Sequence, residues 1–401
     1  MRLVIIGAGF AGMYAALSSA RLREMSNASP GKLEIVLISP EPNLVVRPRL
    51  YEPKPETLTA PLDRVLEAID VKFVRGSVET IDSKSRELGV ATATGARETI
   101  RYDRLVIAAG SRLFRPIIPG LAEHAFAVDQ LADAIKLDRH LHGLADRPAG
   151  AARDTVVVAG GGFTGIEVAT EMPARLRAIL GKEARPRVVI VERGNVIAPD
   201  MGTEARPAIE DALRKVGVET RLGAGVAALD DSGATLSDGT RLESATVIWA
   251  AGMRAAPLTA QVPAERDNFG RLIVDRDLRV SSVPGVFATG DAAKAACDDR
   301  GNFALMSCQH ATRMGAFAGH NAAAELLDVA TRPYHQEAYV TCLDLGAAGA
   351  IFTRGWDRKV ELVGEEAKKT KHEINTVWIY PPRAERAAAL ASADPERVTD
   401  L

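Results

Sequence analysis

Cysteines are scarce in this sequence. Only three of the 401 residues are cysteine, and all three lie in the last third of the chain, at Cys297, Cys308 and Cys342. No two of them have CxxC spacing. A chain of this length without a cysteine framework is typical of a reducing compartment, so we expect no structural disulfides.

Long hydrophobic runs and an excess of charge are also absent. No apolar run approaches the roughly 20 residues that span a bilayer, and the first predicted strand begins at Arg2, which leaves no room for a signal peptide. The formal net charge is −2, which gives no general attraction to nucleic acid or anionic membranes. We therefore expect a cytoplasmic protein with no nucleic-acid partner and at most peripheral contact with the inner face of a membrane.

Two catalytic signatures are missing as well. The seven histidines are scattered along the chain, and neither HExxH nor a paired Cys/His set occurs, so the sequence predicts no metal site. No GxSxG motif is present, which removes the common signature of a Ser–His–Asp hydrolase.

A glycine-rich fingerprint is present twice. Its three glycines are Gly7, Gly9 and Gly12 in the first copy and Gly160, Gly162 and Gly165 in the second. Each copy follows a short apolar run and precedes a helical pattern. The first glycine allows a tight turn, the second lets backbone approach a diphosphate, and the third lets helix and strand pack closely. Glycine turns also end ordinary strands, but two complete copies predict two dinucleotides and electron transfer between them.

The order of predicted elements indicates an α/β fold with two Rossmann-like domains. A strand that ends in Gly290-Asp291 before a helix over 308–327 fits a return of the chain to the first domain, although a simple turn and helix cap would give the same pattern. We therefore expect the second domain to be inserted in the first, with a small C-terminal α+β region. The predicted segments are 1–115 and 271–330 for a FAD-binding domain, 116–150 for a linker helix, 151–270 for an NAD(H)-binding domain, 331–380 for a C-terminal domain and 381–401 for a disordered tail.

Five motifs resemble those of flavoproteins in the pyridine nucleotide–disulfide oxidoreductase superfamily. They are Ile5-Ile6-Gly7-Ala8-Gly9, the run 102–110, the second glycine fingerprint, Val247-Ile248-Trp249-Ala250-Ala251-Gly252 and Ala288-Thr289-Gly290-Asp291-Ala292. The resemblance implies FAD in the first domain and a nicotinamide dinucleotide in the second. No cysteine precedes Cys297, so the redox cysteine pair of the disulfide reductases is absent.

Within that superfamily the chain is similar to type II NADH dehydrogenases, which are single-subunit NADH:quinone oxidoreductases. Three segments carry this similarity, namely 47–51, 162–167 and 308–315, the last aligning with an Ala-Gln-x-Ala-x-Gln-x-Gly quinone motif. Four positions depart from the family pattern, and two of them, Arg47 and Arg49, put positive charge where the family tends to be neutral. Ser39 stands where an acidic residue usually holds the FAD ribose, and Arg313 replaces the second glutamine of the quinone motif.

The fingerprints and the resemblance together assign the candidate site residues. Cofactor contacts are expected at Gly7, Gly9, Phe10, Ala11, Gly12, Ser39, Arg47, Ala109, Gly110, Gly160, Gly162, Gly165, Glu192, Gly252, Gly290, Asp291 and Gln309. Glu192 ends the second strand of the second unit, where a carboxylate accepts both ribose hydroxyls of NADH and repels the 2′-phosphate of NADPH. The adjacent Arg193 would accommodate that phosphate, so NADPH stays the less favoured alternative.

Three residues are candidate catalytic groups. The resemblance implies that Glu167 orients the nicotinamide and couples protons, although a carboxylate in a first helical turn is favourable in any protein. It places Gln309 beside the flavin on the acceptor side. His310 is a candidate proton donor, with capping or packing as the alternative. We expect Lys368 and Lys371 to lie on a solvated helix face, and the aromatic residues Trp356, Trp378 and Tyr380 to pack the C-terminal domain.

The sequence thus predicts an oxidoreductase that takes hydride from NADH to FAD and passes electrons to a quinone or quinone-like acceptor. One alternative is a soluble NAD(P)H-dependent flavoenzyme that reduces a carrier protein or an aromatic or anionic metabolite, because Arg47, Arg49 and Arg313 add positive charge. Another, from a different class, is a redox-dependent binding protein that resembles apoptosis-inducing factor. Homodimer formation stays open.

Overall fold

The first domain is built on a seven-stranded sheet. The computed structural model describes residues 1–397. Five strands are parallel and two more extend the sheet as an antiparallel meander. Their order is β20 (Val286–Ala288), β8 (Arg104–Ile107), β1 (Arg2–Ile6), β2 (Glu34–Ser39), β5 (Lys72–Asp82), β6 (Glu87–Thr92) and β7 (Arg97–Arg101). Because β20 joins from far along the chain, the segment between β8 and β20 is an insertion, which confirms the predicted fold class.

Two helices meet on this sheet at very short range. These are α1 (Phe10–Met25) and α8 (Cys308–Leu327). A Cβ atom at Gly315 would lie 2.3 Å from the carbonyl oxygen of Ala11, and one at Gly319 would lie 2.1 Å from that of Ala15. Only glycine permits this approach, which brings the N-termini of both helices to one edge of the sheet.

The inserted domain holds a second parallel sheet. Its strand order is β10 (Ala125–Phe126), β17 (Thr246–Trp249), β11 (Thr155–Ala159), β12 (Arg187–Glu192) and β13 (Val218–Leu222), packed by helices α4 (Leu131–Gly143), α6 (Phe163–Leu180) and α7 (Gly202–Val216). A small antiparallel sheet follows, made of β14 (Val226–Asp230), β15 (Gly233–Leu236) and β16 (Arg241–Glu243). Segment 116–150 differs from the predicted linker helix, because β10 pairs with the open edge of β17 and so belongs to this domain with α4.

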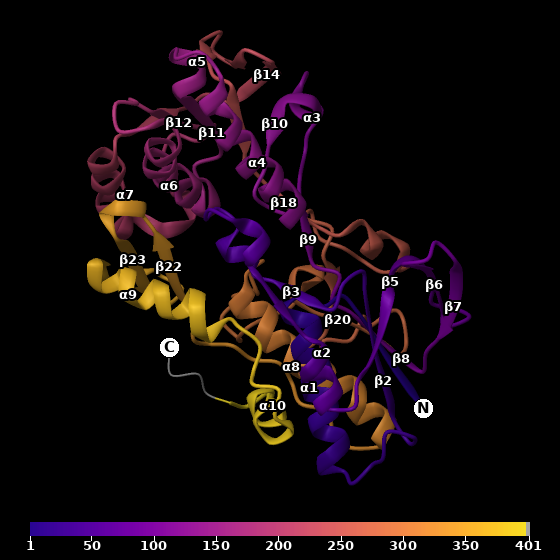
Figure 1. Cartoon of the computed structure of the whole chain (residues 1–401). Coiled ribbons are helices and arrows are strands. Elements are labelled where there is room, and N and C mark those ends of the chain that lie inside the picture. The colour runs from indigo at the N-terminus through magenta and orange to yellow at the C-terminus, as the bar shows by residue number, and fades with distance from the viewer. Residues whose placement is uncertain (398–401) are drawn as a thin grey trace.

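Two short strands connect the domains. These are β9 (Ser111–Leu113) and β18 (Met253–Ala255), which pair antiparallel where the chain leaves and re-enters the first domain. In Figure 1 this pair lies between the two sheets. The hydrogen-bonded crossing fixes where the carboxyl ends of both sheets face one another.

The C-terminal domain packs on the inserted domain. It consists of β22 (Val340–Asp344), β23 (Ala350–Arg354), β24 (Lys359–Gly364), α9 (Glu365–Glu373) and one π-helical turn at Ile374–Trp378. Leu343, Leu345 and Ile351 belong to the same core cluster as Ile166 and Met172 of α6. Strands β22 and β23 in Figure 1 therefore share one core with α6 and α7 of the inserted domain.

The prediction of a disordered tail at 381–401 is wrong for its described part. Helix α10 (Arg386–Ser392) lies against α1 and α2 (Asp63–Ala68), with Ala389 and Leu390 buried. Arg386 forms ion pairs with Glu24 at 2.6 Å and Asp70 at 2.7 Å. An alanine-rich helix with one narrow apolar stripe becomes stable because tertiary contacts supply what its own pattern lacks. Residues 398–401 lie outside the described residues.

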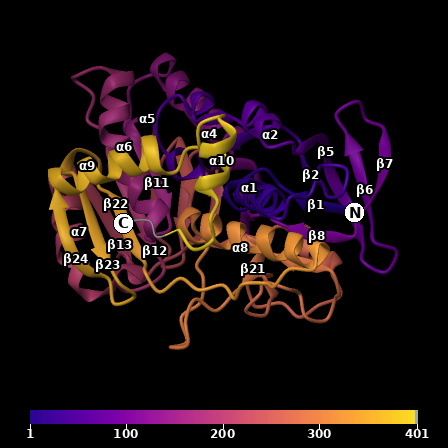
Figure 2. The ribbon, with the colours of Figure 1, turned by 90° about the horizontal axis from the view of Figure 1, so that it is seen from below.

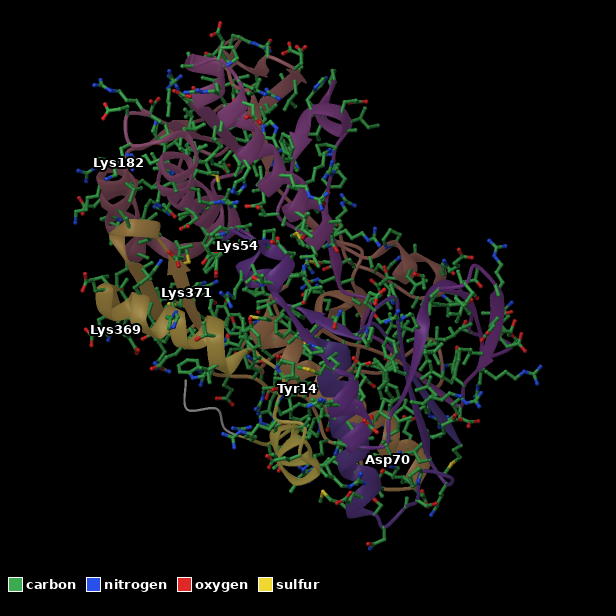
Figure 3. The ribbon with its side chains drawn as sticks, in the orientation of Figure 1. Tyr14, Lys54, Asp70, Lys182, Lys369 and Lys371 are labelled. Carbon is green, nitrogen blue, oxygen red and sulfur yellow. The ribbon has the colours of Figure 1, made fainter. Side chains whose placement is uncertain are left out.

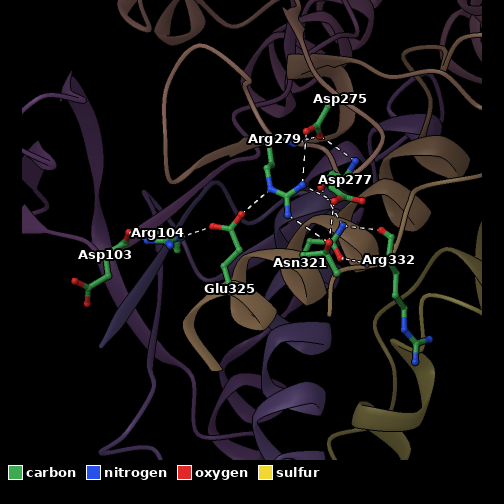
Figure 4. A network of polar contacts seen from close by, with 9 residues as sticks. Asp103, Arg104, Asp275, Asp277, Arg279, Asn321, Glu325 and Arg332 are labelled. Carbon is green, nitrogen blue, oxygen red and sulfur yellow. Dashed lines mark hydrogen bonds and ion pairs between the residues drawn. The ribbon is translucent and has the colours of Figure 1, made fainter. Parts of the chain in front are cut away.

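A polar network locks the returning chain onto the first domain (Figure 4). Glu325 on α8 accepts hydrogen bonds from Arg104 of β8 at 2.5 Å and from Arg279 of the returning segment at 2.6 Å. The buried side chain of Asn321 donates to the carbonyl oxygens of Asp277 at 3.0 Å and Arg332 at 2.8 Å. The network holds α8 in register with the sheet, so that its N-terminus stays at the sheet edge.

No helix within residues 1–397 combines the length and the hydropathy needed to cross a lipid bilayer.

Candidate functional site

The first fingerprint forms an open cradle at the start of α1. Gly7 has φ +100°, and a Cβ there would lie 2.4 Å from the carbonyl oxygen of Ala108. At Gly12 a Cβ would lie 1.7 Å from the carbonyl oxygen of Gly7. Gly9 caps the helix without a side-chain hydrogen bond, and a Cβ there would meet no atom within 4 Å. Free N–H groups of the first turn therefore face open space, as binding of a diphosphate requires.

The second fingerprint repeats this geometry at α6. Gly160 has φ +119°, and a Cβ at Gly165 would lie 1.9 Å from the carbonyl oxygen of Gly160. Gly162 caps the helix without a side-chain bond and also has open space around its Cβ position. The carboxylate of Glu192 accepts hydrogen bonds from the N–H groups of Gly161 at 2.7 Å and Gly194 at 2.6 Å. Those bonds hold it beside the cradle.

Asp291 lies at the carboxyl end of β20, beside the first cradle. Its carboxylate accepts a hydrogen bond from the Ser111 hydroxyl at 2.5 Å and lies 3.6 Å from the Arg47 guanidinium. Burial raises the pKa of Asp291 above its usual range, against the opposing effect of Arg47. Arg47 also pairs with Asp129 at 2.5 Å, and Asp129 accepts from the backbone N–H of Leu113 in the interdomain connection. Arg47 thus links this pocket to the junction between the domains.

The other predicted cofactor residues lie around the two cradles. Phe10 and Ala11 form the first turn of α1, Ala109 and Gly110 follow β8, and Gly252 follows β17. A Cβ at Gly290 would lie 2.8 Å from that of Ala11, so the Asp291 turn touches the first fingerprint. Ser39 ends β2 opposite Arg75, whose guanidinium lies 3.1 Å from the Glu41 carboxylate.

Glu167 lies in a buried ion pair that sequence reasoning missed. Its carboxylate accepts hydrogen bonds from the Lys371 ammonium at 2.7 Å and the Asp344 backbone N–H at 3.1 Å. Lys371 was expected on a solvated face, yet only 5% of it is exposed, and it also donates to the carbonyl oxygen of Cys342 at 3.0 Å. Burial raises the pKa of Glu167 to about 7, although Lys371 opposes the rise. The sequence held one signal for its burial: Lys371 stands four residues after the apolar Ala367, and so on the same face of the helix.

Further polar groups connect this pair to the surface. Asp344 accepts hydrogen bonds from Lys368 at 2.5 Å and from the Tyr51 hydroxyl at 3.2 Å. The Lys368 side chain is 40% exposed, whereas Tyr51 is buried. The prediction of a solvated face is therefore wrong for Lys371 and only partly right for Lys368. The four residues that surround Glu167 come from three segments distant in sequence.

Gln309 and His310 occupy the start of α8. The Gln309 side-chain oxygen accepts from the Val340 backbone N–H at 3.4 Å. His310 is fully buried, its Nδ1 lies 2.9 Å from the Ser307 hydroxyl, and its ring packs on Tyr339 and Trp356 at centroid distances of 5.0 and 5.8 Å. Burial lowers the pKa of His310 to about 3. This packing fits the alternative of a capping and packing residue, and the role of proton donor stays a prediction.

The predicted aromatic packing holds for part of the group. Trp356 stacks on Tyr339 at 4.8 Å, and the Tyr380 hydroxyl accepts from Arg49 at 2.9 Å, but Trp378 is 41% exposed. Among residues 1–397 no three His, Cys, Asp or Glu side chains are grouped so that they could hold a metal ion.

Comparison with known proteins identifies the family. The profile of the pyridine nucleotide-disulphide oxidoreductases matches residues 1–315. The chain belongs to this family. An NADH dehydrogenase-like protein of Mycobacterium tuberculosis is 47% identical over 397 residues, which are 98% of each chain. A type II NADH:quinone oxidoreductase of the same organism is 31% identical over 318 residues, covering 72% of this chain and 66% of the relative.

Solved structures share the fold of this oxidoreductase. Sulfide:quinone oxidoreductase from Aquifex aeolicus superposes with a TM-score of 0.77 at 18% identity and covers 97% of this chain and 92% of its own. NDH2 from Plasmodium falciparum has a TM-score of 0.74 at 15% identity, with 98% and 97% covered. At such identities the likeness shows the fold alone. The family and the named relatives confirm the predicted enzyme class, an oxidoreductase, and the family implies the use of a flavin and a nicotinamide nucleotide.

The first cradle fits the dinucleotide of a flavin cofactor. Gly9 leaves room for a diphosphate at uncapped N–H groups, and the Asp291 carboxylate can accept hydrogen bonds from a polyol chain. The hydroxyl of Thr289 is buried without a hydrogen-bond partner at the same sheet edge. In this oxidoreductase the donors and acceptors of the pocket therefore match the chemistry of a flavin dinucleotide.

We expect Gly9→Val to remove the flavin without unfolding the protein. The new side chain enters open space, but it blocks N–H groups whose two hydrogen bonds to a charged diphosphate are together worth about 3 kcal/mol, so flavin affinity falls roughly a hundredfold. Flavin-to-protein ratio and reconstitution titrations measure this. Gly143→Val, at the end of α4 and also in open space, is the control. Equal flavin loss in both variants would contradict flavin binding at the first fingerprint.

Replacement of Lys371 should shift the pH dependence of the enzyme upward. The ammonium favours the ionised form of Glu167, so Lys371→Met raises the pKa of that carboxyl above about 7. The rate limb that follows Glu167 ionisation then moves to higher pH by roughly one unit or more. Lys369→Met is the matched control, because Lys369 is exposed on the same helix, as Figure 3 shows. Stopped-flow rates over a range of pH give the apparent pKa of this limb. An apparent pKa that does not rise in Lys371→Met would count against coupling between Glu167 and Lys371.

Proposed function

We propose that this oxidoreductase is an FAD-dependent NADH:quinone oxidoreductase. The observation that carries the proposal is the pair of equivalent open cradles, at Gly9 and Gly162, in one chain. The names of its relatives support the donor and the acceptor, because they include an NADH dehydrogenase-like protein and type II NADH:quinone oxidoreductases. When bound, FAD would take a hydride from the nicotinamide and deliver electrons to the acceptor.

The chain would hold the two nucleotides with different groups. N–H groups at the start of α1 would bind the FAD diphosphate, and Asp291, steadied by Ser111 and Arg47, would accept the ribityl hydroxyls. N–H groups at the start of α6 would bind the NADH diphosphate. The Glu192 carboxylate would accept the ribose hydroxyls, which favours NADH because a 2′-phosphate would meet its negative charge.

Proton handling would fall to the buried network behind the second cradle. Reduction of a quinone consumes two protons at its oxygens. Burial raises the pKa of Glu167 to about 7, so this carboxyl can exchange a proton at neutral pH. The Lys371 ammonium donates a hydrogen bond to the Glu167 carboxylate at 2.7 Å. Asp344 and the half-exposed Lys368 would connect the pair to solvent.

The internal ion pairs weaken the anionic-metabolite alternative. Arg47 is paired with Asp129, Arg49 with Glu52 at 2.7 Å, and Arg313 donates to two carbonyl oxygens. Two of the three cations that favoured an anionic substrate in the sequence, Arg47 and Arg49, are therefore paired with carboxylates within the fold. A carrier-protein acceptor and a redox-dependent binding role become outcomes of the following test.

We expect NADH to reduce the purified flavoprotein rapidly and a short-chain quinone to reoxidise it over many turnovers. Gln309→Ala should lower kcat/KM for the quinone about tenfold, as loss of one hydrogen bond would, and leave flavin reduction by NADH unchanged. Gln261→Ala, at an exposed glutamine in the first domain, is the control. Anaerobic stopped-flow absorbance separates the two half-reactions. Flavin reduction without quinone turnover would point to a carrier protein, and slow reduction by NADH to a binding role.

Glu192→Gln should weaken the preference for NADH over NADPH. The amide keeps an acceptor for the Gly194 N–H, but its lost charge no longer repels a 2′-phosphate. We expect the ratio of kcat/KM for the two nucleotides to fall roughly tenfold or more, which corresponds to about 1.4 kcal/mol. Glu219→Gln, an exposed carboxylate in the same domain, should leave the ratio unchanged. An unaltered ratio in Glu192→Gln would remove the basis for assigning NADH.

A further inference from the structure

The chain does not end at α10. Residues 393–397, here called the strap, continue from the helix, and Ala393 and Pro395 are buried. Side chains of α1 and α8 contact the strap, through Arg21 and Arg313 respectively. Figure 2 shows this part of the chain passing beside the start of α8. The strap is therefore part of the folded surface: it begins beside Arg21 in the C-terminal half of α1 and ends beside Arg313 in the second turn of α8.

Acidic side chains of the strap bind basic side chains beneath it. The Asp394 carboxylate lies 2.6 Å from the Arg21 guanidinium and 4.0 Å from that of Arg332. The Glu396 carboxylate lies 3.4 Å from the His335 ring and 4.0 Å from Arg332. Each of these pairs is partly exposed, so salt and competing anions can reach it.

The end of the strap is bound by Arg313. Its guanidinium donates to the Arg397 carbonyl oxygen at 3.1 Å and to the His335 carbonyl oxygen at 2.9 Å. Arg313 stands one helical turn after Gln309 on α8. On α1, Tyr14 stands one turn after Phe10, and the charge of Arg397 acts on its phenol. The strap thus reaches both helices one turn from the cradle edge.

We propose that the strap covers the acceptor side of the flavin pocket and has to lift before the acceptor binds. This rests on the proposed function for the place of the acceptor beside Gln309. The quinone motif that this chain resembles has a glutamine where Arg313 stands. In this chain Arg313 instead donates to the Arg397 carbonyl oxygen of the strap. The side chain that would face an incoming acceptor therefore holds the strap in place.

The test compares the two half-reactions in the holoenzyme with and without the strap. One variant ends at Ala393, which keeps α10. A second, full-length variant carries Asp394→Asn and Glu396→Gln, and it keeps the test valid if the shortened chain fails to fold. Each is reduced anaerobically, once with NADH and once with dithionite, and then mixed with menadione. We expect reoxidation by menadione to become roughly tenfold faster, because the open state is no longer a minor population, while reduction by NADH keeps its rate.

Glu219→Gln is the matched control, since it removes an exposed carboxylate from an ion pair of the inserted domain. The wild-type enzyme should also gain reoxidation rate with added salt, and the charge-neutral variant should lose that dependence. Equal reoxidation rates in wild type and both variants, whether fast or zero, would overturn the proposal that the strap has to lift before the acceptor binds. Failure of NADH to reduce the flavin would instead count against the proposed function, because dithionite reduction tests the strap without NADH.

Discussion

The carbonyl oxygen of Gly7 lies 1.7 Å from where a Cβ at position 12 would be, and the carbonyl of Gly160 lies 1.9 Å from the same point at position 165. No side chain fits either gap. This contact seats each helix directly on the turn that precedes it, and it therefore fixes where the free N–H groups of α1 and α6 point. Gly315 and Gly319 extend the same constraint to α8, whose N-terminus could not otherwise reach the edge that α1 occupies. The cradles, the Asp291 turn and the Gln309 position all depend on these backbone contacts.

The Glu167–Lys371 pair serves a different purpose from those packing contacts. A buried ion pair is poor evidence for stability, because desolvation offsets much of the attraction, whereas loss of one partner costs about 3–5 kcal/mol. An apolar pair of similar volume could join α6 to α9 equally well. Burial raises the pKa of Glu167 to about 7 with the Lys371 ammonium 2.7 Å away, and a carboxyl perturbed in this way is what the proposed proton handling requires. The same pair also fastens the C-terminal domain to the helix that starts at the second cradle.

Local pattern was enough for the parts of the fold that local interactions determine. The fingerprints, the helix over 308–327 and the return strand before Asp291 followed from glycine spacing and apolar runs, and the resemblance added the family. Lys371 and α10 were misjudged because their environment comes from residues far away in sequence. A lysine among charged neighbours has the pattern of a solvated helix face until Glu167, about 200 positions earlier, supplies the counter-charge. Likewise α10 is too short to be stable alone and depends on α1 and α2 for its burial.

The way α10 is attached determines what the strap can do. Ala389 and Leu390 are buried and Arg386 is paired with both Glu24 and Asp70, so the helix stays on α1 when the residues beyond it move. The acidic side chains at 394 and 396 therefore remain tethered close to Arg21 and Arg332, at a high effective concentration, even when the strap is lifted. Under the proposal, such a tether would close again each time the acceptor leaves. Under the proposal, the nucleotide would enter a cradle at Gly162 that has open space, whereas the acceptor would compete with the strap for the surface beside Gln309.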